Sequence, residues 1–137
     1  MLPIIITRRI DSANARNWPG LVVMHPDCPL PAAVLAQEAV EAIAKLNPVT
    51  LTRTRLSAPY RRQMEVWSHE HEVQAAALIY GRDVARYRAA EAERMVAGYD
   101  GLFAGISPEW VAYRMASHSD EANRWVRRNR NWLERWK

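Results

Sequence analysis

Two stretches decide the fold of this chain: PAAVLAQEAVEAIAKL at residues 31–46 and PYRRQMEVWSHEHEVQAAALIYG at residues 59–81. Proline is favoured at the first position of a helix, where its missing N–H would have no partner anyway, so both stretches begin as helices do. Apolar side chains then recur in each at helical spacing. In the second stretch this stripe consists of Met64, Trp67, His71, Ala75 and Leu78. Both stretches also carry carboxylates between the apolar positions, which predicts two facing, acid-bearing helices.

Short extended segments are expected near the N-terminus. The β-branched runs PIIIT at residues 3–7 and LVVM at residues 21–24 indicate two strands, as a hairpin or a strand pair. Turn-forming residues at 11–20 predict a loop between them. Residues 49–58 alternate between apolar and polar side chains, which predicts a short strand or an extended linker.

Three further helices bring the expected total to about five, so the fold class is mainly α. They are predicted over residues 82–97, from 108 to about 117, and from 119 towards the end of the chain. The pair Ser107-Pro108 is a strong start signal, because a hydroxyl can cap the helix and proline suits its first position. Glu91 and Glu93 alternate with arginines and are expected to form exposed ion pairs.

Length and composition predict one domain over residues 1–137. With 49% hydrophobic and 25% charged residues, the chain is typical of globular proteins. The formal net charge is +4, and arginine supplies nearly all of the cations, since Lys45 and Lys137 are the only lysines. Arginine suits the recognition of carboxylates and phosphates, so an acidic partner or a nucleic acid is permitted but not required. An Arg-rich composition is equally typical of GC-rich genomes.

The chain carries no sign of export. Cys28 is the only cysteine, which excludes an intrachain disulfide and favours a reducing compartment. The first residues, MLPIIITRRI, place apolar side chains before the arginines, the reverse of a signal peptide. No stretch approaches the roughly 18 apolar residues of a membrane span. We therefore expect an intracellular protein, or part of an assembly built in the cytosol, with no membrane partner.

The first central helix contains Gln37-Glu38-x-x-Glu41, which has the spacing of the HExxH motif. In that motif two histidines on one helical face hold a metal ion, and the glutamate activates water. Here Gln37 and Glu41 stand where the histidines would be, and Glu38 stands where the general base would be. Glu70, on the inward side of the second helix, is the acid placed to supply a further ligand.

On these features the chain resembles the minigluzincins, small zinc peptidases with phage and bacterial relatives. The resemblance covers about residues 3–80: a short β region, a helix after the strand end VVMHP, and a YRR run leading into the ExE pattern Glu70-His71-Glu72. It implies a gluzincin-like helical core and a bacterial or virion-associated protein. It also implies a catalytic role for Glu38 and a metal held by Gln37, Glu41 and Glu70.

The departure from the motif leaves three interpretations open. Zinc prefers imidazole or thiolate, and glutamine is a poor ligand, so a zinc peptidase of the usual kind is not expected. Glu41 and Glu70 suit a harder cation such as Mg²⁺ or Mn²⁺. Alternatively the site is a non-catalytic relic, or Glu41 simply pairs with Lys45 while Glu38 is solvated. We expect no cofactor unless the metal-dependent alternative holds.

The histidines and Cys28 are expected to be ordinary residues. His69 and His71 are two positions apart and cannot both point inward on a helix. His71 lies on the core stripe, whereas Glu65, His69 and Glu72 are predicted to point away from it. Cys28 follows Asp27, which would raise the pKa of its thiol, so no nucleophilic role is expected.

The C-terminal segment offers a rival functional surface. Trp125, Trp132 and Trp136 recur on one helical stripe, which predicts that they pack on the body of the protein. The arginines between them are then left for water, a protein partner or nucleic acid. These are Arg124, Arg127, Arg128, Arg130 and Arg135.

The leading hypothesis is therefore a non-catalytic phage or bacterial accessory protein on a degenerate metallopeptidase-like scaffold, acting through protein contacts or self-association. A metal-dependent hydrolase with a carboxylate-rich site is the first alternative. Nucleic-acid binding through the C-terminal arginines is the second.

Overall fold

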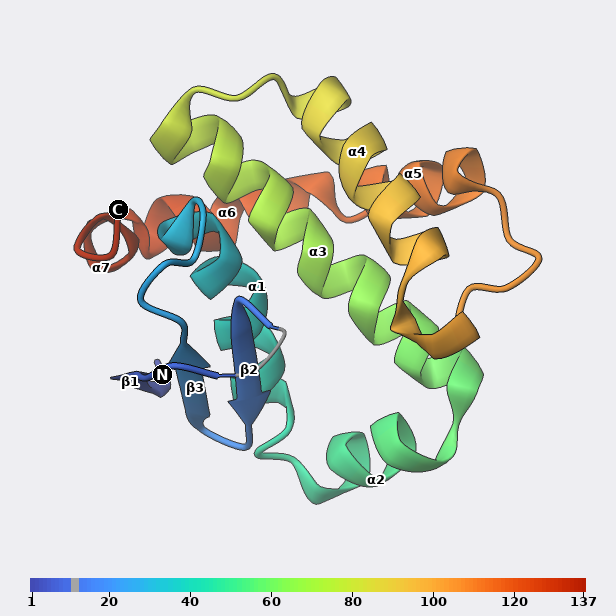
Figure 1. The fold of residues 1–137 in the computed structure, drawn as a ribbon, viewed down its shortest axis with the longest axis horizontal. Helices are drawn as coiled ribbons and strands as arrows, with labels where there is room; N and C mark the ends of the chain where they lie inside the picture. The colour runs from blue at the N-terminus through green and yellow to red at the C-terminus, as the bar shows by residue number, and fades with distance from the viewer. Residues whose placement is uncertain (11–12) are drawn as a thin grey trace.

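The computed structural model describes residues 1–10 and 13–137 and is mainly helical, as predicted (Figure 1). The long helix α3 crosses the middle of the molecule, with the sheet and α1 on one side and α4 and α5 on the other. The strands are β1 (Ile4–Thr7), β2 (Ala15–Trp18) and β3 (Leu21–Met24). The helices are α1 (Pro31–Ala44), α2 (Pro48–Leu56), α3 (Ala58–Tyr80), α4 (Val84–Ala97), the 3₁₀ turn η1 (Tyr99–Gly101), α5 (Pro108–Ala116), α6 (Ser119–Arg128) and α7 (Arg130–Glu134).

The ends of the central helices follow from their local sequence. Pro31 opens α1, and the side chain of Ser57 caps α3 by accepting a hydrogen bond from the backbone N–H of Tyr60. Gly81 ends α3 in the left-handed conformation, with φ of 67°, which favours glycine because it has no Cβ. Both predicted central helices are confirmed, with bounds within two residues of those expected.

The sheet has the order β1-β3-β2 and contains one strand that the sequence did not predict. β1 runs parallel to β3, and β2 pairs with β3 as an antiparallel hairpin. The loop predicted for residues 11–20 was thus wrong for Ala15–Trp18, and residues 11 and 12 lie outside the described residues. The backbone N–H of Gly20 donates to the carbonyl of Ala42 at 2.9 Å, which fastens the hairpin to α1.

The strand or linker predicted over residues 49–58 was also wrong, because Pro48–Leu56 forms α2. Asn47 caps this helix by accepting hydrogen bonds from the backbone N–H groups of Val49 and Thr50. None of the α2 side chains is fully buried. The alternating pattern therefore does not reflect one buried strand face, and the Asn-Pro start signal dominates.

Two apolar clusters lie on α3. The first includes Leu35 of α1 and Ala75 of α3, and it is covered by Trp125, Trp132 and Trp136, which confirms the predicted tryptophan stripe. The second includes Val73 of α3 together with Met95, Phe103, Val111 and Met115. Burying each large apolar side chain stabilises the fold by about 1.5–3 kcal/mol. Because α3 is covered on both sides, its polar side chains are enclosed as well as its apolar ones.

The C-terminal part is divided more finely than predicted. The single helix expected after residue 119 is broken at Asn129 into α6 and α7, and α2 is additional. These changes account for a helix count above five. No helix among the described residues combines the length and apolar character needed to cross a membrane.

Candidate metal centre

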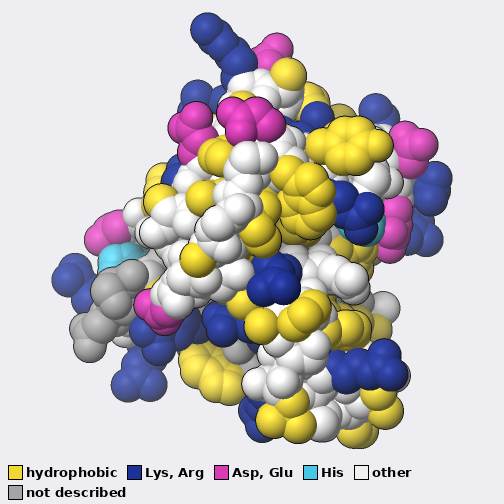
Figure 2. Space-filling model, turned by 90° about the vertical axis from the view of Figure 1, so that its right-hand side faces the viewer, with side chains coloured by type: hydrophobic (Ala, Val, Ile, Leu, Met, Phe, Trp, Pro, Cys, Tyr) yellow, Lys and Arg dark blue, Asp and Glu magenta, His cyan; other side chains and the backbone are white. Residues whose placement is uncertain are grey.

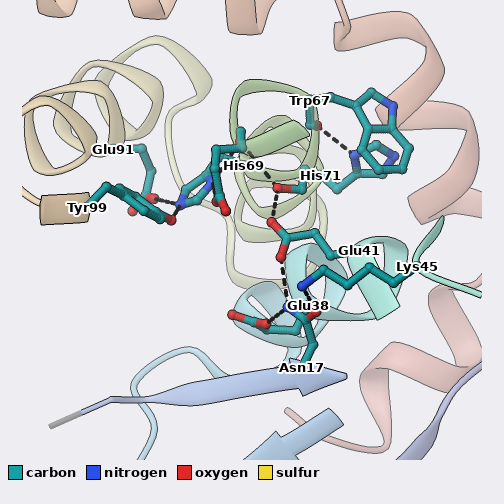
Figure 3. A network of polar contacts seen from close by, with 11 residues as sticks. Asn17, Glu38, Glu41, Lys45, Trp67, His69, His71, Glu91 and Tyr99 are labelled. Atoms are coloured by element: carbon teal, nitrogen blue, oxygen red, sulfur yellow. Dashed lines mark hydrogen bonds and ion pairs between the residues drawn. The ribbon is translucent and has the colours of Figure 1, made fainter. Parts of the chain in front are cut away.

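Polar side chains from α1 and α3 meet in the interior between the two helices (Figure 3). Six polar side chains of the two helices are all at most 8% exposed. They are Gln37, Glu38 and Glu41 of α1 and Glu65, His69 and Glu72 of α3. The expectation that Glu65, His69 and Glu72 point away from the core was wrong because α1 and α4 cover that side of α3, and the interpretation that Glu38 is solvated was wrong because Glu38 is buried beside the hairpin.

Three of these side chains converge closely enough to hold a metal ion. Glu41, Glu65 and His69 each offer one ligand atom, and the three atoms lie within 4.8 Å of one another. Glu65 and His69 are one helical turn apart, so their side chains project from the same face of α3. The imidazole that α1 lacks is thus supplied by the facing helix.

The α1 acids are held by a polar network that reaches the hairpin. The side-chain N–H₂ group of Asn17, on β2, donates to Glu38 and, at 2.7 Å, to Glu41. Lys45 donates from Nζ to Asn17 Oδ1 at 2.6 Å, in place of the ion pair with Glu41 that one interpretation had expected. The hydroxyl of Ser68 donates to the second oxygen of Glu41 at 2.5 Å. Both Glu41 oxygens are therefore fixed in direction.

His69 is oriented by hydrogen bonds at both ring nitrogens. Its Nδ1–H donates to the backbone carbonyl of Glu65 at 2.8 Å, so the lone pair lies on Nε2. Nε2 lies 2.9 Å from the hydroxyl of Tyr99, which donates to it. Glu91 of α4 approaches the same nitrogen at 3.8 Å. A backbone carbonyl bound to one imidazole nitrogen is the arrangement that commonly orients a metal-binding histidine.

The carboxyl groups are electrostatically strained. Burial, together with the nearby Glu41 carboxylate, raises the pKa of Glu38 from 4.5 to about 8. The same two causes raise the pKa of Glu65 well above its ordinary value. Glu65 Oε2 is buried and has no hydrogen-bond partner among the described residues. A buried oxygen without a partner is costly, and a nearby cation would relieve both effects.

A cavity of about 360 Å³ adjoins the cluster and is called the acidic cavity below. Among the described residues its walls include the acids Glu38, Glu72 and Glu91, with Gln37, His69, Tyr87, Arg94 and Tyr99. The Arg94 side chain is 65% exposed and ion-paired with Glu91, so an arginine stands at the solvent side of this wall. Glu91 was expected to form an exposed ion pair with an arginine. The ion pair is present and Arg94 is exposed, but Glu91 itself is buried.

The predicted site residues divide into two groups. Glu38 and Glu41 lie together in the network, and Gln37 lines the acidic cavity. Glu70 is fully buried, as its inward position suggested, but Arg88 binds both of its oxygens, at 2.9 and 2.6 Å. It does not belong to the metal-competent group.

Sequence reasoning did not assign Glu65, His69, Glu91 or Asn17 to the site. The i, i+4 spacing of Glu65 and His69 was the available signal, but the helical wheel assigned both to the surface. No pattern within α4 distinguishes Glu91 from its exposed neighbour Glu93. The role of Asn17 depends on strand β2, which was not predicted.

The remaining chemistry-bearing residues are placed as expected. His71 is 1% exposed, and its Nδ1–H donates to the Trp67 carbonyl at 2.9 Å. Burial lowers its pKa, as for a neutral core histidine. Burial, with smaller contributions from Glu72 and Glu38, raises the pKa of the Cys28 thiol to about 11. The five C-terminal arginines are all exposed: Arg124, Arg127, Arg128, Arg130 and Arg135.

Neither a family model, nor a curated protein, nor a solved structure matches this chain.

Proposed function

We propose that this protein is a metal-dependent hydrolase whose metal is held by Glu41, Glu65 and His69. The observation that carries the proposal is the convergence of these three ligand atoms within 4.8 Å, with Glu65 Oε2 buried and without a hydrogen-bond partner in the described part of the chain. Isolated buried carboxylates are costly, whereas carboxylates around a divalent cation are stabilised. A protein without such a role would gain stability from apolar side chains at the same positions.

The donor set suits a transition metal better than a purely hard ion. Two carboxylates favour Mg²⁺ or Mn²⁺, while the imidazole favours Zn²⁺, Mn²⁺ or Fe²⁺. Mn²⁺ and Zn²⁺ accept both donor types, so these two ions are proposed. Such an ion, when bound, supplies a Lewis acid that lowers the pKa of a coordinated water. The ligand set differs from the one that the resemblance implies, since Glu65 and His69 take the places of Gln37 and Glu70.

Glu38 is the proposed general base. It is held beside Glu41 by Asn17, and it lines the acidic cavity, where a substrate and water have access. In the proposed reaction Glu38 takes a proton from water as the water oxygen bonds to the substrate carbonyl carbon. The proton then passes to the leaving nitrogen as the amide bond breaks. A raised pKa suits both transfers near neutral pH.

An extended peptide is the proposed substrate. Among the described strands, β2 has β3 as its neighbour on one side, so its other edge is available to an added strand. Asn17 on β2 contacts both Glu38 and Glu41, which puts this edge strand beside the acids. An extended chain along β2 would carry its backbone carbonyls past the acidic cavity.

The experiment measures bound metal and hydrolysis on the same purified preparations. Elemental analysis after loading with Mn²⁺ or Zn²⁺ should give one ion per chain for the wild type and for the control Glu93→Gln, an exposed position on α4. Glu65→Gln should lose the ion, because the amide is a weak ligand. On a fluorescently labelled unfolded protein, Glu38→Gln should keep the ion and lose hydrolysis by roughly 100-fold or more.

An ion that binds equally well to wild type and Glu65→Gln would overturn the metal site. A loaded wild type that hydrolyses nothing in a mixed peptide library would overturn the enzyme.

The second candidate is the non-catalytic accessory protein acting through protein contacts or self-association. It is favoured by the absence of histidine from positions 37 and 41 and by the exposure of all five C-terminal arginines. The same measurements separate it from the first, because it predicts no hydrolysis whether or not an ion binds. A protein partner would be sought with the pair Arg127→Gln and Arg128→Gln, which should weaken capture of that partner.

A further inference from the structure

A second, larger cavity lies on the opposite side of α3 from the metal centre. It has a volume of about 610 Å³, within the range of small-molecule sites, and is called the aromatic cavity below. Its walls come from the end of α1, from α2, the first half of α3 and α5, and from His118, the residue that precedes α6. The metal-centre residues do not line it. The side chains that matter here are Tyr60, Arg62, Trp67, Trp110, Arg114 and His118.

The aromatic walls are held in place by contacts outside the cavity. Trp67 Nε1–H donates to Glu121 at 3.2 Å, and the Trp67 ring meets His71 edge-on at 4.9 Å between centroids. Trp110 is 48% exposed, so it stands at the solvent side of the cavity. A fixed ring inside and a half-exposed ring at the mouth provide stacking surfaces for a planar group.

The charge of this cavity is opposite to that of the metal centre. Among the described residues that line it none is acidic, whereas Arg62, Arg114 and His118 are basic. Arg114 lies over the Trp110 ring, 5.8 Å from its centroid, and is otherwise exposed. Arg62 donates to the Leu102 carbonyl at 3.2 Å, which fixes its guanidinium at the wall. Arginines beside aromatic rings suit a ligand that combines a planar ring with an anion. Figure 2 views the molecule from the α5 side, where hydrophobic side chains lie next to those of Lys and Arg.

We propose that the aromatic cavity binds a nucleotide, with the base stacked on Trp67 and Trp110 and the phosphate held by Arg114. The planar base matches the aromatic walls, and the phosphate matches a guanidinium that already lies at the mouth. A free nucleotide and one unit of a single-stranded nucleic acid offer the same chemistry. This site is independent of the proposed metal and hydrolysis.

The test uses three probes with the same base: adenosine, AMP and an octamer of deoxyadenosine. Tryptophan quenching and calorimetry should show saturable binding of AMP that is tighter than that of adenosine. Arg114→Gln should weaken the binding affinity for AMP by about tenfold or more. It should change the affinity for adenosine by less than about threefold, because only AMP carries the phosphate. Trp110→Leu should weaken both by about fivefold or more.

Control variants separate this site from other basic surfaces and from the metal centre. Arg130→Gln, on α7, and Glu65→Gln should bind AMP as the wild type does. If the octamer binds much more tightly than AMP, and its affinity falls steeply with salt, the site is supported and its ligand is a single-stranded nucleic acid. Comparable affinities for octamer and AMP support it and assign the free nucleotide.

Absence of saturable AMP and octamer binding at millimolar concentration would overturn the proposal. So would binding that Arg114→Gln and Trp110→Leu leave unchanged while circular dichroism shows both variants folded.

Discussion

The acidic cavity and the aromatic cavity share one helix but differ in how their polar groups are satisfied. At the metal centre beside the acidic cavity, burial raises the pKa of Glu38 and Glu65, and Glu65 Oε2 has no hydrogen-bond partner among the described residues. In the aromatic cavity, Trp67 and Arg62 each have a hydrogen-bond partner. The first arrangement is costly without a cation, and the second is stable as it stands. A functional ion is expected beside carboxylates whose burial is not compensated. A cavity whose polar side chains already have hydrogen-bond partners is expected to bind its ligand without relieving such a cost.

The strongest test of this difference concerns Glu70, a buried acid whose charge is already balanced by an arginine. Because Arg88 binds both of its oxygens, Arg88→Leu would leave an uncompensated buried carboxylate. We expect a loss of about 3–5 kcal/mol in the free energy of unfolding, measured by urea denaturation. Metal content should not change, since Glu70 lies outside the ligand group. Loss of the metal with unchanged stability would instead make Glu70 a ligand.

A cation should stabilise the protein through the acidic cavity alone. At a Mn²⁺ or Zn²⁺ concentration about 100 times the dissociation constant, the gain in unfolding free energy should be about 2.7 kcal/mol. Thermal denaturation should show a higher Tm for the wild type and none of this gain for His69→Ala. Arg114→Gln, in the aromatic cavity, should retain the gain. Equal shifts in His69→Ala and the wild type would point to binding elsewhere.

Acidity provides the most diagnostic effect, because it is spread over several pH units. The folded protein holds a proton on Glu38 up to about pH 8, whereas the unfolded chain releases it near pH 4.5. The metal-free protein should therefore lose stability as pH rises from about 4.5 to 8, by at most about 1.4 kcal/mol per pH unit for this proton. Glu38→Gln should reduce the slope over that window, as measured by denaturation at a series of pH values, and Glu65, whose pKa is also raised, should supply the part that remains. A slope that the substitution leaves unchanged would assign the proton to another group.

The fold was largely predictable because its signals are local. Pro31, Ser57 and Gly81 mark helix ends through their own backbone chemistry, and these marks hold in any tertiary setting. The hairpin strand Ala15–Trp18 has no such signal. Two of its four residues are polar and none is β-branched, and it forms because β3 is available to pair with it.

The candidate site was predictable only in part, because its burial is a tertiary effect. Spacing within α1 identified Glu38 and Glu41 correctly as neighbours. A helical wheel assigns polar residues to solvent, so it misplaced Glu65 and His69, which another part of the chain covers. Glu70 shows the opposite case: its inward direction was correct, but the partner Arg88 is 18 positions away and carries no sequence signal.

The shared helix has a consequence for regulation. Trp67 of the aromatic cavity and His69 of the acidic cavity are two residues apart on α3, a 23-residue helix enclosed by both cores. A rotation or shift of α3 as a rigid rod moves both walls at once. Thermodynamic linkage then requires reciprocity: the factor by which an occupant of one cavity changes affinity in the other must be the same in both directions. Cavities that behave independently, as the Glu65→Gln and Arg114→Gln controls expect, give a factor of one in both directions, which means that α3 does not shift when either cavity is filled.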